Sequence, residues 1–323
     1  MDLEATRHRL LEPPTGPILV WKKVGIMATE HFSTRFQDLD TWSSLDILSA
    51  FYEGQLSAVA AVRSSLPAIA AAAEEAAQRL RRGGRLVYVG AGTSGRIGVQ
   101  DGTELPPTFN WPDDKLVYLI AGGERAIMKA VENAEDSVEE GIAGIRNNDI
   151  GPTDVVIGVA ASGRTPFTIA ALKEAASRGA QTIGISNNAG APILDACSHP
   201  ILADTGEEVI AGSTRMKAGT AQKVILNLLS SLIMVRMGRV YRGLMVNMRA
   251  TNAKLRRRSE IMVCQITDCG EAKAADAILQ AGGDLKTAVL IAMGADPQEA
   301  HEALARCDGN LREALADFSR LKR

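Results

Sequence analysis

Hydrophobic side chains recur at helical spacing near the start of the chain, between residues 43 and 82. The positions are Leu45, Ile47, Leu48, Phe51, Leu56, Val59 and Val62. Gly83 and Gly84 come next, and glycine is common just past the end of a helix. The pattern therefore predicts a long helical region that ends at these two glycines.

Five short apolar runs come after this region. They cover residues 85–89, 116–120, 155–159, 182–185 and 199–202. Strands that are buried on both faces form continuous apolar runs, and helical segments separate the first four runs. We therefore expect an α/β fold with a parallel five-stranded sheet and helices on both faces, arranged as an αβα sandwich.

The remainder of the chain is mostly helical in its pattern. Residues 213–237 form the strongest predicted helix, and Ser213 or Thr214 is the expected cap. Its most apolar part, residues 224–235, is shorter than the roughly 20 residues that span a bilayer, so we expect a buried helix. From residue 245 onward, glycines interrupt a helical pattern that predicts a small C-terminal helical bundle.

The predicted elements divide the chain into four parts. These are an N-terminal extension (1–42), an N-terminal helical region (43–75), the sandwich (76–239) and a C-terminal helical region (240–323). The first 26 residues contain prolines and charged residues but no continuous apolar core. We expect them to be irregular, without a secretory signal.

The composition indicates an aliphatic core and no polyanionic partner. Hydrophobic residues make up 46% of the 323 residues, and aromatic residues only 4%. The formal net charge is -2, whereas proteins that bind nucleic acids usually carry a concentrated basic surface. One basic cluster, residues 254–258, lies in a helical pattern, and we interpret it as a solvated face. We expect neither nucleic acid nor a membrane as a partner.

The cysteines and histidines favour no metal site. The four cysteines form no C-x-x-C pair, and the four histidines are scattered. A disulfide framework is rare in a chain of this length, so we expect reduced thiols and a cytoplasmic location.

A glycine-rich loop, Gly90 to Arg96 (GAGTSGR), follows the first predicted strand. It matches the G-x-G-x-x-G pattern of dinucleotide-binding proteins, which would indicate a nicotinamide-dependent dehydrogenase. That pattern expects an acidic residue at the end of the second strand, but Glu124 comes late. Taken alone, the match is weak.

A second loop of the same kind, residues 161–166, follows the third predicted strand. Both loops contain Ser-Gly-Arg and open a helix, so each offers backbone N–H groups and a positive helix end to an anion. Two such loops suit a compact phosphorylated ligand better than a dinucleotide. A third element, residues 212–217, places Arg215 and Lys217 near a helix start. This is locally unfavourable and indicates a bound anion or a nearby carboxylate.

These elements supply the predicted ligand contacts. The candidates are Thr93, Ser94, Gly95, Arg96, Ser162, Gly163, Arg164, Thr165, Ser213 and Lys217.

Two places in the sequence offer a carboxylate for acid–base chemistry. Glu104 comes just before two prolines, which would end a helix and fix the local backbone. Glu132 and Glu135 lie at helical spacing on neighbouring surface, and the spacing does not choose between them.

Four ordered stretches resemble the sugar isomerase (SIS) domain and, more narrowly, the N-acetylmuramic acid 6-phosphate etherase family. They are GAGTSGR (90–96), DGTELPPTF (101–109), AGGERAIMKAVENAED (121–136) and GEEVIAGSTRMKAGTAQK (206–223). The last is similar to a signature of glucokinase regulatory proteins. The departures from the family pattern, at residues 102, 103, 105 and 207, remove no carboxylate and no residue of the anion loops.

The resemblance implies a bacterial cytoplasmic lyase of peptidoglycan recycling. Such an enzyme cleaves the lactyl ether of N-acetylmuramic acid 6-phosphate, giving N-acetylglucosamine 6-phosphate and D-lactate. It also implies a homodimer, with no metal and no cofactor. By the same resemblance, Glu104 is the general acid for the leaving oxygen, and Glu135 is the base that removes the proton beside the carbonyl.

Two further interpretations remain open beside the etherase and the dehydrogenase. A sugar-phosphate isomerase on the same domain would also use a base beside a carbonyl, but it would release no lactate. A non-catalytic sugar-phosphate-binding regulator usually carries two SIS units, and only one is visible here. The C-terminal turn at residues 308–311 resembles ubiquitin-associated helical bundles in fold alone.

Overall fold

A five-stranded parallel sheet forms the centre of the computed structural model, which describes residues 27–248 and 253–321. The strand order is β2-β1-β3-β4-β5. The strands are β1 (Leu86–Gly90), β2 (Leu116–Ile120), β3 (Val155–Val159), β4 (Gln181–Ser186) and β5 (His199–Leu202). They lie within a residue or two of the predicted runs, and β1, β3 and β4 are buried throughout. The expected α/β fold class is confirmed.

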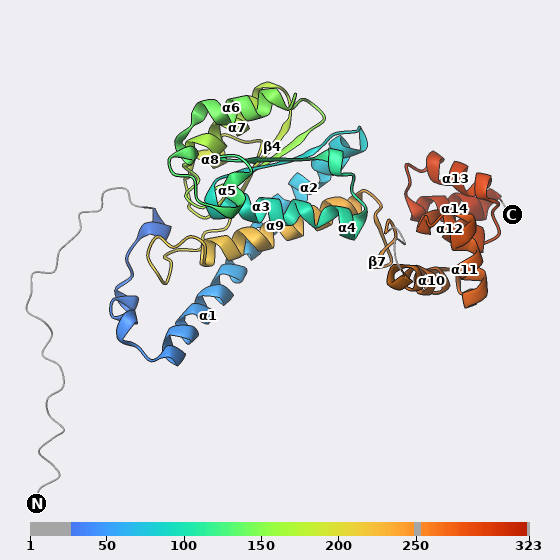
Figure 1. The fold of residues 1–323 in the computed structure, drawn as a ribbon, viewed down its shortest axis with the longest axis horizontal. Coiled ribbons are helices and arrows are strands. Elements are labelled where there is room, and N and C mark those ends of the chain that lie inside the picture. Colours follow the sequence, from blue (N-terminus) through green and yellow to red (C-terminus); the bar gives the residue numbers. More distant parts are fainter. Residues whose placement is uncertain (1–26, 249–252, 322–323) are drawn as a thin grey trace, which may run out of the picture.

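Helices cover both faces of the sheet (Figure 1). On one face lie α2 (Leu66–Arg81), α3 (Gly92–Thr103) and α9 (Lys217–Arg236), and on the other lie α6 (Val138–Asn147) and α7 (Pro166–Ser177). Side chains alternate along β1, so that Tyr88 belongs to the first layer and Val87 to the second. The result is the predicted αβα sandwich.

The long N-terminal helical region is present but interrupted. It consists of α1 (Ser44–Ala61), a 3-10 turn η4 (Val62–Ser65) and α2. Fully buried alanines bring α2 close to its neighbours, whereas α1 projects from the sandwich (Figure 1). Three short 3-10 turns precede α1, namely η1 (Ala28–Glu30), η2 (Thr34–Phe36) and η3 (Leu39–Thr41). The expectations for residues 1–26 lie outside the described residues.

The helix α9 begins at Lys217, four residues later than the predicted start. Ser213 and Thr214 do not cap it, because they lie in the turn that precedes it. The buried carboxylate of Glu208 accepts hydrogen bonds from the backbone N–H groups of Lys217 and Ala218, each at 2.9 Å. The predicted cap is therefore wrong, and a distant acidic residue provides it.

Residues 44–81 and 217–236 are long and apolar enough to cross a membrane by length and composition alone. The core helices of folded domains satisfy the same criterion. The second stretch is α9, which packs beneath the sheet as predicted, with Ile225, Leu229 and Ile233 fully buried.

The C-terminal part begins with a hairpin that the sequence pattern did not predict, β6 (Val240–Tyr241) and β7 (Leu244–Met245). Five helices follow. They are α10 (Ala253–Thr267), α11 (Glu271–Gln280), α12 (Leu285–Ala292), α13 (Pro297–Arg306) and α14 (Leu311–Leu321). They share a hydrophobic core of their own and stand at the end of the molecule opposite α1 (Figure 1). The expected helical bundle is thus confirmed.

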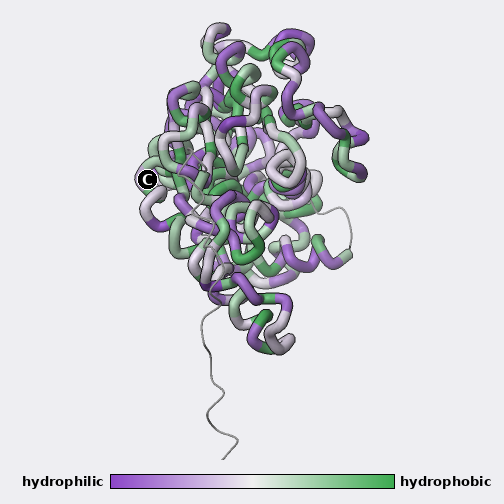
Figure 2. Tube along the Cα trace, turned by 90° about the vertical axis from the view of Figure 1, so that its left-hand side faces the viewer, coloured by the Kyte–Doolittle hydropathy of each residue, from purple (hydrophilic) through white to green (hydrophobic). Residues whose placement is uncertain are grey.

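The distribution of hydropathy follows this arrangement. Figure 2 shows hydrophobic segments gathered within the body of the molecule and hydrophilic ones toward its outer parts. The basic cluster on α10 is exposed, and Arg257 pairs there with Glu260 and Glu271. The structure therefore supports the interpretation of this cluster as a solvated face.

Candidate active site

The two predicted anion loops lie side by side at the carboxyl edge of the sheet. The chain places β2 on one side of β1 and β3 on the other, and the last residue of β1, Gly90, is level with Ile120 of β2 and Val159 of β3. In open α/β sheets, ligands bind in the crevice at such a change of direction. The fold therefore brings both loops to the position where this architecture binds small molecules.

The first loop holds the start of α3 directly against the end of β1. A Cβ atom at Gly95 would lie 2.9 Å from the carbonyl oxygen of Gly90, so only glycine fits there. Ser94 is buried and Thr93 is half-buried at this helix start. Arg96 behaves differently, because its Nε donates to the carbonyl oxygens of Ala126 and Ile127 at 3.1 and 3.0 Å. Its side chain holds the segment that leads toward Glu135.

The second loop, residues 161–165, is packed as tightly as the first. Gly163 has a φ of +61°, and a Cβ atom there would lie 2.4 Å from the Cβ of Ala191. The Oγ of Ser162 accepts a hydrogen bond from the backbone N–H of Arg164 at 3.2 Å. Arg164 is exposed, and Thr165 precedes α7 without a side-chain capping hydrogen bond.

The third element joins the first loop at the start of α9. A Cβ atom at Gly219 would lie 3.6 Å from the Cγ2 of Thr93, so the first turns of α9 and α3 are in contact. The Nζ of Lys217 donates to the carbonyl oxygen of Glu207 at 2.8 Å. Ser213 lies half-buried in the turn before the helix.

Glu208 places a carboxylate beside the cationic turn at residues 212–217, where the sequence indicated either a bound anion or a nearby carboxylate. Burial raises its pKa, although the two backbone N–H groups that it caps oppose this. The sequence pattern does not indicate this role. Glu208 lies nine residues before the first N–H group that it caps, and no local spacing marks it as a cap.

Glu135 lies at the same edge of the sheet, but not on an α-helix, although its spacing from Glu132 is helical. It belongs to a 3-10 turn, η6 (Ala134–Asp136), which packs against α7 beside the second loop. Asn133 has a φ of +61°, and Val131 packs so closely on Gly122 that a Cβ atom there would lie 2.7 Å away. These backbone bends take the place of a helix there. Glu135 is exposed.

Glu104 lies at the other end of α3. The twelve residues of this helix span about 18 Å, so Glu104 is near the amino edge of the sheet, away from the loops and from Glu135. It is exposed and immediately precedes the short helix α4 (Leu105–Phe109), whose first turn contains proline as predicted. The full length of α3 therefore separates Glu104 from the first anion loop in its own chain.

Asp101, which the sequence pattern did not single out, anchors the end of α3 that carries Glu104. Its buried carboxylate accepts hydrogen bonds from the hydroxyl of Tyr88 at 2.9 Å and from that of Ser230 at 3.2 Å. Burial raises the pKa of Asp101, although these hydrogen bonds oppose the shift. The position of Glu104 is thus fixed by contacts to β1 and α9.

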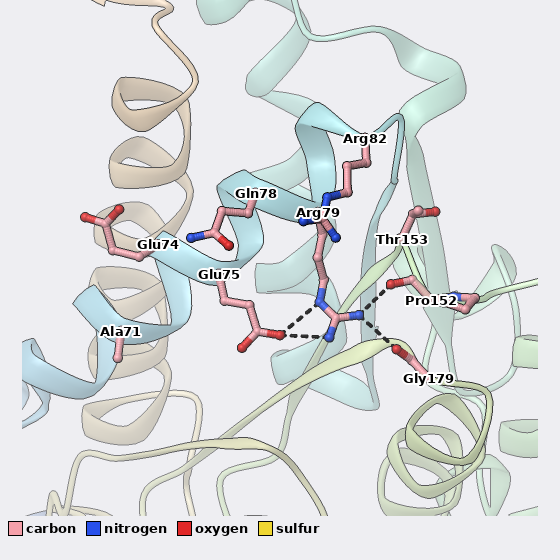
Figure 3. A pocket seen from close by; sticks show the side chains of 9 residues that line it. All are labelled: Ala71, Glu74, Glu75, Gln78, Arg79, Arg82, Pro152, Thr153 and Gly179. Atoms are coloured by element: carbon pink, nitrogen blue, oxygen red, sulfur yellow. Dashed lines mark hydrogen bonds and ion pairs between the residues drawn. The ribbon is translucent and has the colours of Figure 1, made fainter.

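A large groove of about 640 Å³ lies at the amino edge of the sheet, on α2 (Figure 3). Figure 3 shows Glu75 and Arg79 pointing toward one another, and their ion pair measures 2.8 Å. Glu75 also contacts the Nε2 of His199 at 2.8 Å, and Arg79 donates to the carbonyl oxygens of Pro152 and Gly179. These contacts fasten α2 to β5 and to the segments that precede β3 and β4.

Across the described ranges, 27–248 and 253–321, no group of three or more His, Cys, Asp or Glu side chains could hold a metal ion.

Comparisons with known proteins agree with this architecture. A sequence profile described as "Glucokinase regulatory protein N-terminal SIS domain" matches residues 68–176, and one described as "SIS domain" matches residues 126–232. An N-acetylmuramic acid 6-phosphate etherase from Deinococcus radiodurans is 49% identical, over 90% of this chain and 95% of the relative. One from Rubrobacter xylanophilus is 42% identical, over 93% and 99%. The chain belongs to the N-acetylmuramic acid 6-phosphate etherase family.

Membership of the etherase family confirms the resemblance predicted from the four motifs. Among solved structures, a phosphoheptose isomerase from Francisella tularensis aligns with 60% of this chain and all of its own, with 19% identity and a TM-score of 0.45. The individual roles of Glu104, Glu135 and the loop residues stay predictions.

Proposed function

We propose that this chain is a carbon–oxygen lyase that cleaves the D-lactyl ether of N-acetylmuramic acid 6-phosphate, giving N-acetylglucosamine 6-phosphate and D-lactate. The observation that carries this conclusion is the 49% identity to an etherase of that name along 95% of the relative. The two anion loops at the carboxyl edge fit a small sugar phosphate. We place the enzyme in the recycling of peptidoglycan amino sugars. We also place it in the cytoplasm, which agrees with its four free cysteines.

The phosphate group binds, in this proposal, between the loops after β1 and β3. Thr93 and Ser94 open α3, and Ser162 and Thr165 precede α7, so hydroxyl groups and backbone N–H groups converge on one crevice. The positive ends of the two helices favour an anion there. Arg96 acts indirectly, since its guanidinium is bound to the carbonyl oxygens of α5 (Arg125–Met128).

The chemistry follows from the opened sugar ring. The ring-opened form has an aldehyde, which acidifies the proton on the adjacent carbon, and the lactyl ether is attached one carbon further on. A base removes that proton, the carbon–oxygen bond to lactate breaks, and an acid protonates the departing oxygen. Water then adds to the unsaturated aldehyde. Each proton transfer typically contributes about 10²–10⁴-fold in rate.

Glu135 acts as the base in this scheme, because it lies beside the loops that hold the phosphate. Glu104 acts as the acid, but in its own chain it lies at the far end of α3, about 18 Å from the loop at which that helix begins. We propose that the acid of each site comes from a second copy of the chain. The active enzyme is then a homodimer with sites shared between its subunits.

The surface of α1 supports this dimer. Five large apolar side chains are exposed along it at helical spacing: Leu45 (74%), Leu48 (61%), Tyr52 (65%), Leu56 (53%) and Val59 (48%). A contiguous apolar surface of this kind marks an interaction site. A second copy would bury these side chains and carry its own Glu104 toward the first chain.

The release of D-lactate tests the proposed reaction. We expect the wild-type protein to release lactate from N-acetylmuramic acid 6-phosphate, and Glu135→Gln and Glu104→Gln each to lose about 10²-fold or more in kcat. Glu132→Gln is the matched control, since it neutralises an exposed glutamate three residues from Glu135. If the wild type only interconverted sugar phosphates without lactate, the chain would be an isomerase. Near-normal rates of lactate release in folded Glu135→Gln and Glu104→Gln proteins would contradict the roles of these residues as base and acid.

A further inference from the structure

Thr29 is the most tightly held residue of the segment that precedes α1. It is wholly buried in the turn η1. Its backbone N–H donates to the Oδ1 of Asn188 at 3.3 Å, and its Oγ1 accepts from the Nδ2 of Asn188 at 3.0 Å. Its carbonyl oxygen accepts from the backbone N–H of Gly212 at 3.1 Å. The start of the described chain is therefore fastened to two distant segments.

Asn188 connects this turn to the loop after β3. Its Nδ2 donates at 2.8 Å to the carbonyl oxygen of Ala161, the residue that precedes Ser162. The amide is buried, and these contacts use its acceptor and both of its donors. The same carbonyl oxygen also accepts from the backbone N–H of Asn187 and the Oγ of Ser186. The start of the second anion loop is thus held by three donors.

Gly212 connects the same turn to the third element. It has a φ of +74° and immediately precedes Ser213 in the turn before α9. The carboxylate of Glu30 lies against it, because a Cβ atom at Gly212 would be 3.0 Å from the Oε2 of Glu30. Residues 28–30, 161–165 and 212–217 therefore form one hydrogen-bonded unit at the carboxyl edge, although they are far apart in sequence.

We propose that Thr29 and Asn188 are positioning residues of the sugar-phosphate site, which fasten the N-terminal turn to the loop after β3 and to the turn before α9. This inference rests on the proposed function, because it takes the loop after β3 as the holder of the phosphate. An anion binds most tightly to N–H groups that are already ordered, because no binding free energy is then spent on ordering the loop. Part of the predicted N-terminal extension accordingly belongs to the substrate site.

The test separates substrate binding from catalysis. Thr29→Val removes the hydroxyl acceptor with little change of shape, and Asn188→Asp removes both donors while keeping the size. We expect each to raise KM for N-acetylmuramic acid 6-phosphate about tenfold, with kcat within about twofold of wild type. The Kd of the product, N-acetylglucosamine 6-phosphate, measured by calorimetry, rises in parallel.

The controls isolate the hydroxyl contact. Thr29→Ser keeps the hydroxyl and is expected to restore KM to within about twofold of wild type. Thr41→Val removes an exposed threonine hydroxyl of the same segment that donates only to the nearby carbonyl oxygen of Asp38, and it leaves KM unchanged. Asn188→Asp serves as the second variant if Thr29→Val does not fold, as judged by circular dichroism.

Two results would overturn the inference. One is a normal KM and product Kd in a folded Thr29→Val or Asn188→Asp protein. The other is a loss confined to kcat or to thermal stability, which would make the contacts merely structural. Either result with a lactate-releasing wild type leaves the proposed function standing. A wild type that neither binds the sugar phosphate nor releases lactate would refute the proposed function itself.

Discussion

Gly163 occupies the tightest position of the loop after β3. Its φ of +61° disfavours a side chain, and a Cβ atom would also lie 2.4 Å from the Cβ of Ala191. We expect Gly163→Ala to displace the loop and so to raise KM for the substrate about tenfold or more. Steady-state kinetics of lactate release measures this.

Gly282 provides the matched control for that prediction. It has nearly the same φ, +59°, but nothing lies within 4 Å of its Cβ position. Gly282→Ala should lower the unfolding free energy by about 1–2 kcal/mol through backbone strain alone, and KM should be unchanged. An unaltered KM in Gly163→Ala would show that this loop does not bind the substrate.

Polar side chains of the site differ in how visible they are in the sequence. The sequence context alone predicts some of them, because Ser162, Thr93 and Ser94 lie in glycine-rich loops directly after apolar runs. The roles of Glu208 and Asn188 could not be predicted, since their hydrogen-bonding partners depend on how distant segments meet. Thr29 and Asn188 are separated by 159 positions, a distance at which no spacing rule operates.

At the scale of elements, the parallel strands were the most predictable part of the molecule. A strand such as β3, buried on both faces, needs only a continuous apolar run, whereas the turn η6 depends on local bends at Gly122 and Asn133. Glu132 and Glu135 stand at helical spacing, but the structure has a 3-10 turn at Glu135 and the helix begins only at Val138. The hairpin β6–β7 has two residues per strand, too few to produce a recognisable alternation.

The helix α12 carries a buried lysine that links the stability of the C-terminal bundle to pH. Lys286 is 7% exposed, and its Nζ donates to the carbonyl oxygen of Gly309 at 2.6 Å. Burial lowers the pKa of Lys286 from 10.5 to about 8. The folded protein therefore releases this proton at a lower pH than the unfolded chain does.

The sign of the pH dependence follows directly. Between about pH 8 and pH 10.5 the unfolded chain binds more protons at this position, so the contribution of Lys286 to stability rises with pH. We expect the unfolding free energy of the wild type to rise by up to about 1.4 kcal/mol per pH unit relative to that of Lys286→Met, as measured by urea unfolding. Lys273→Met, which removes an exposed lysine on α11, should show no such difference. Parallel pH profiles for wild type and Lys286→Met would contradict the expectation.

At the scale of the whole molecule, the two candidate catalytic glutamates lie at different edges of the sheet. The anion loops and Glu135 lie at the carboxyl edge, while Glu104 lies near the amino edge, and α1 presents uncovered apolar side chains. A second copy of the chain would cover the apolar side chains of α1 and could bring its own Glu104 to the Glu135 of the first.

The apolar surface of α1 gives a direct test of assembly. Leu48→Glu combined with Leu56→Glu should convert the proposed dimer to monomers, because two charges would be buried in the proposed interface. Light scattering measures the mass, and lactate release should fall with it. Leu279→Glu is the control, since Leu279 is 80% exposed on α11, away from α1. A doubly substituted protein that stays dimeric and active would place the interface elsewhere.

The most direct test of the account is to mix two inactive variants. Glu104→Gln and Glu135→Gln proteins are combined, allowed to exchange subunits, and assayed for D-lactate. If each site takes its acid from one subunit and its base from the other, every mixed dimer has one intact site, and about one quarter of the wild-type rate returns. If verified mixed dimers stay as inactive as the separate variants, the two glutamates do not act across a shared site.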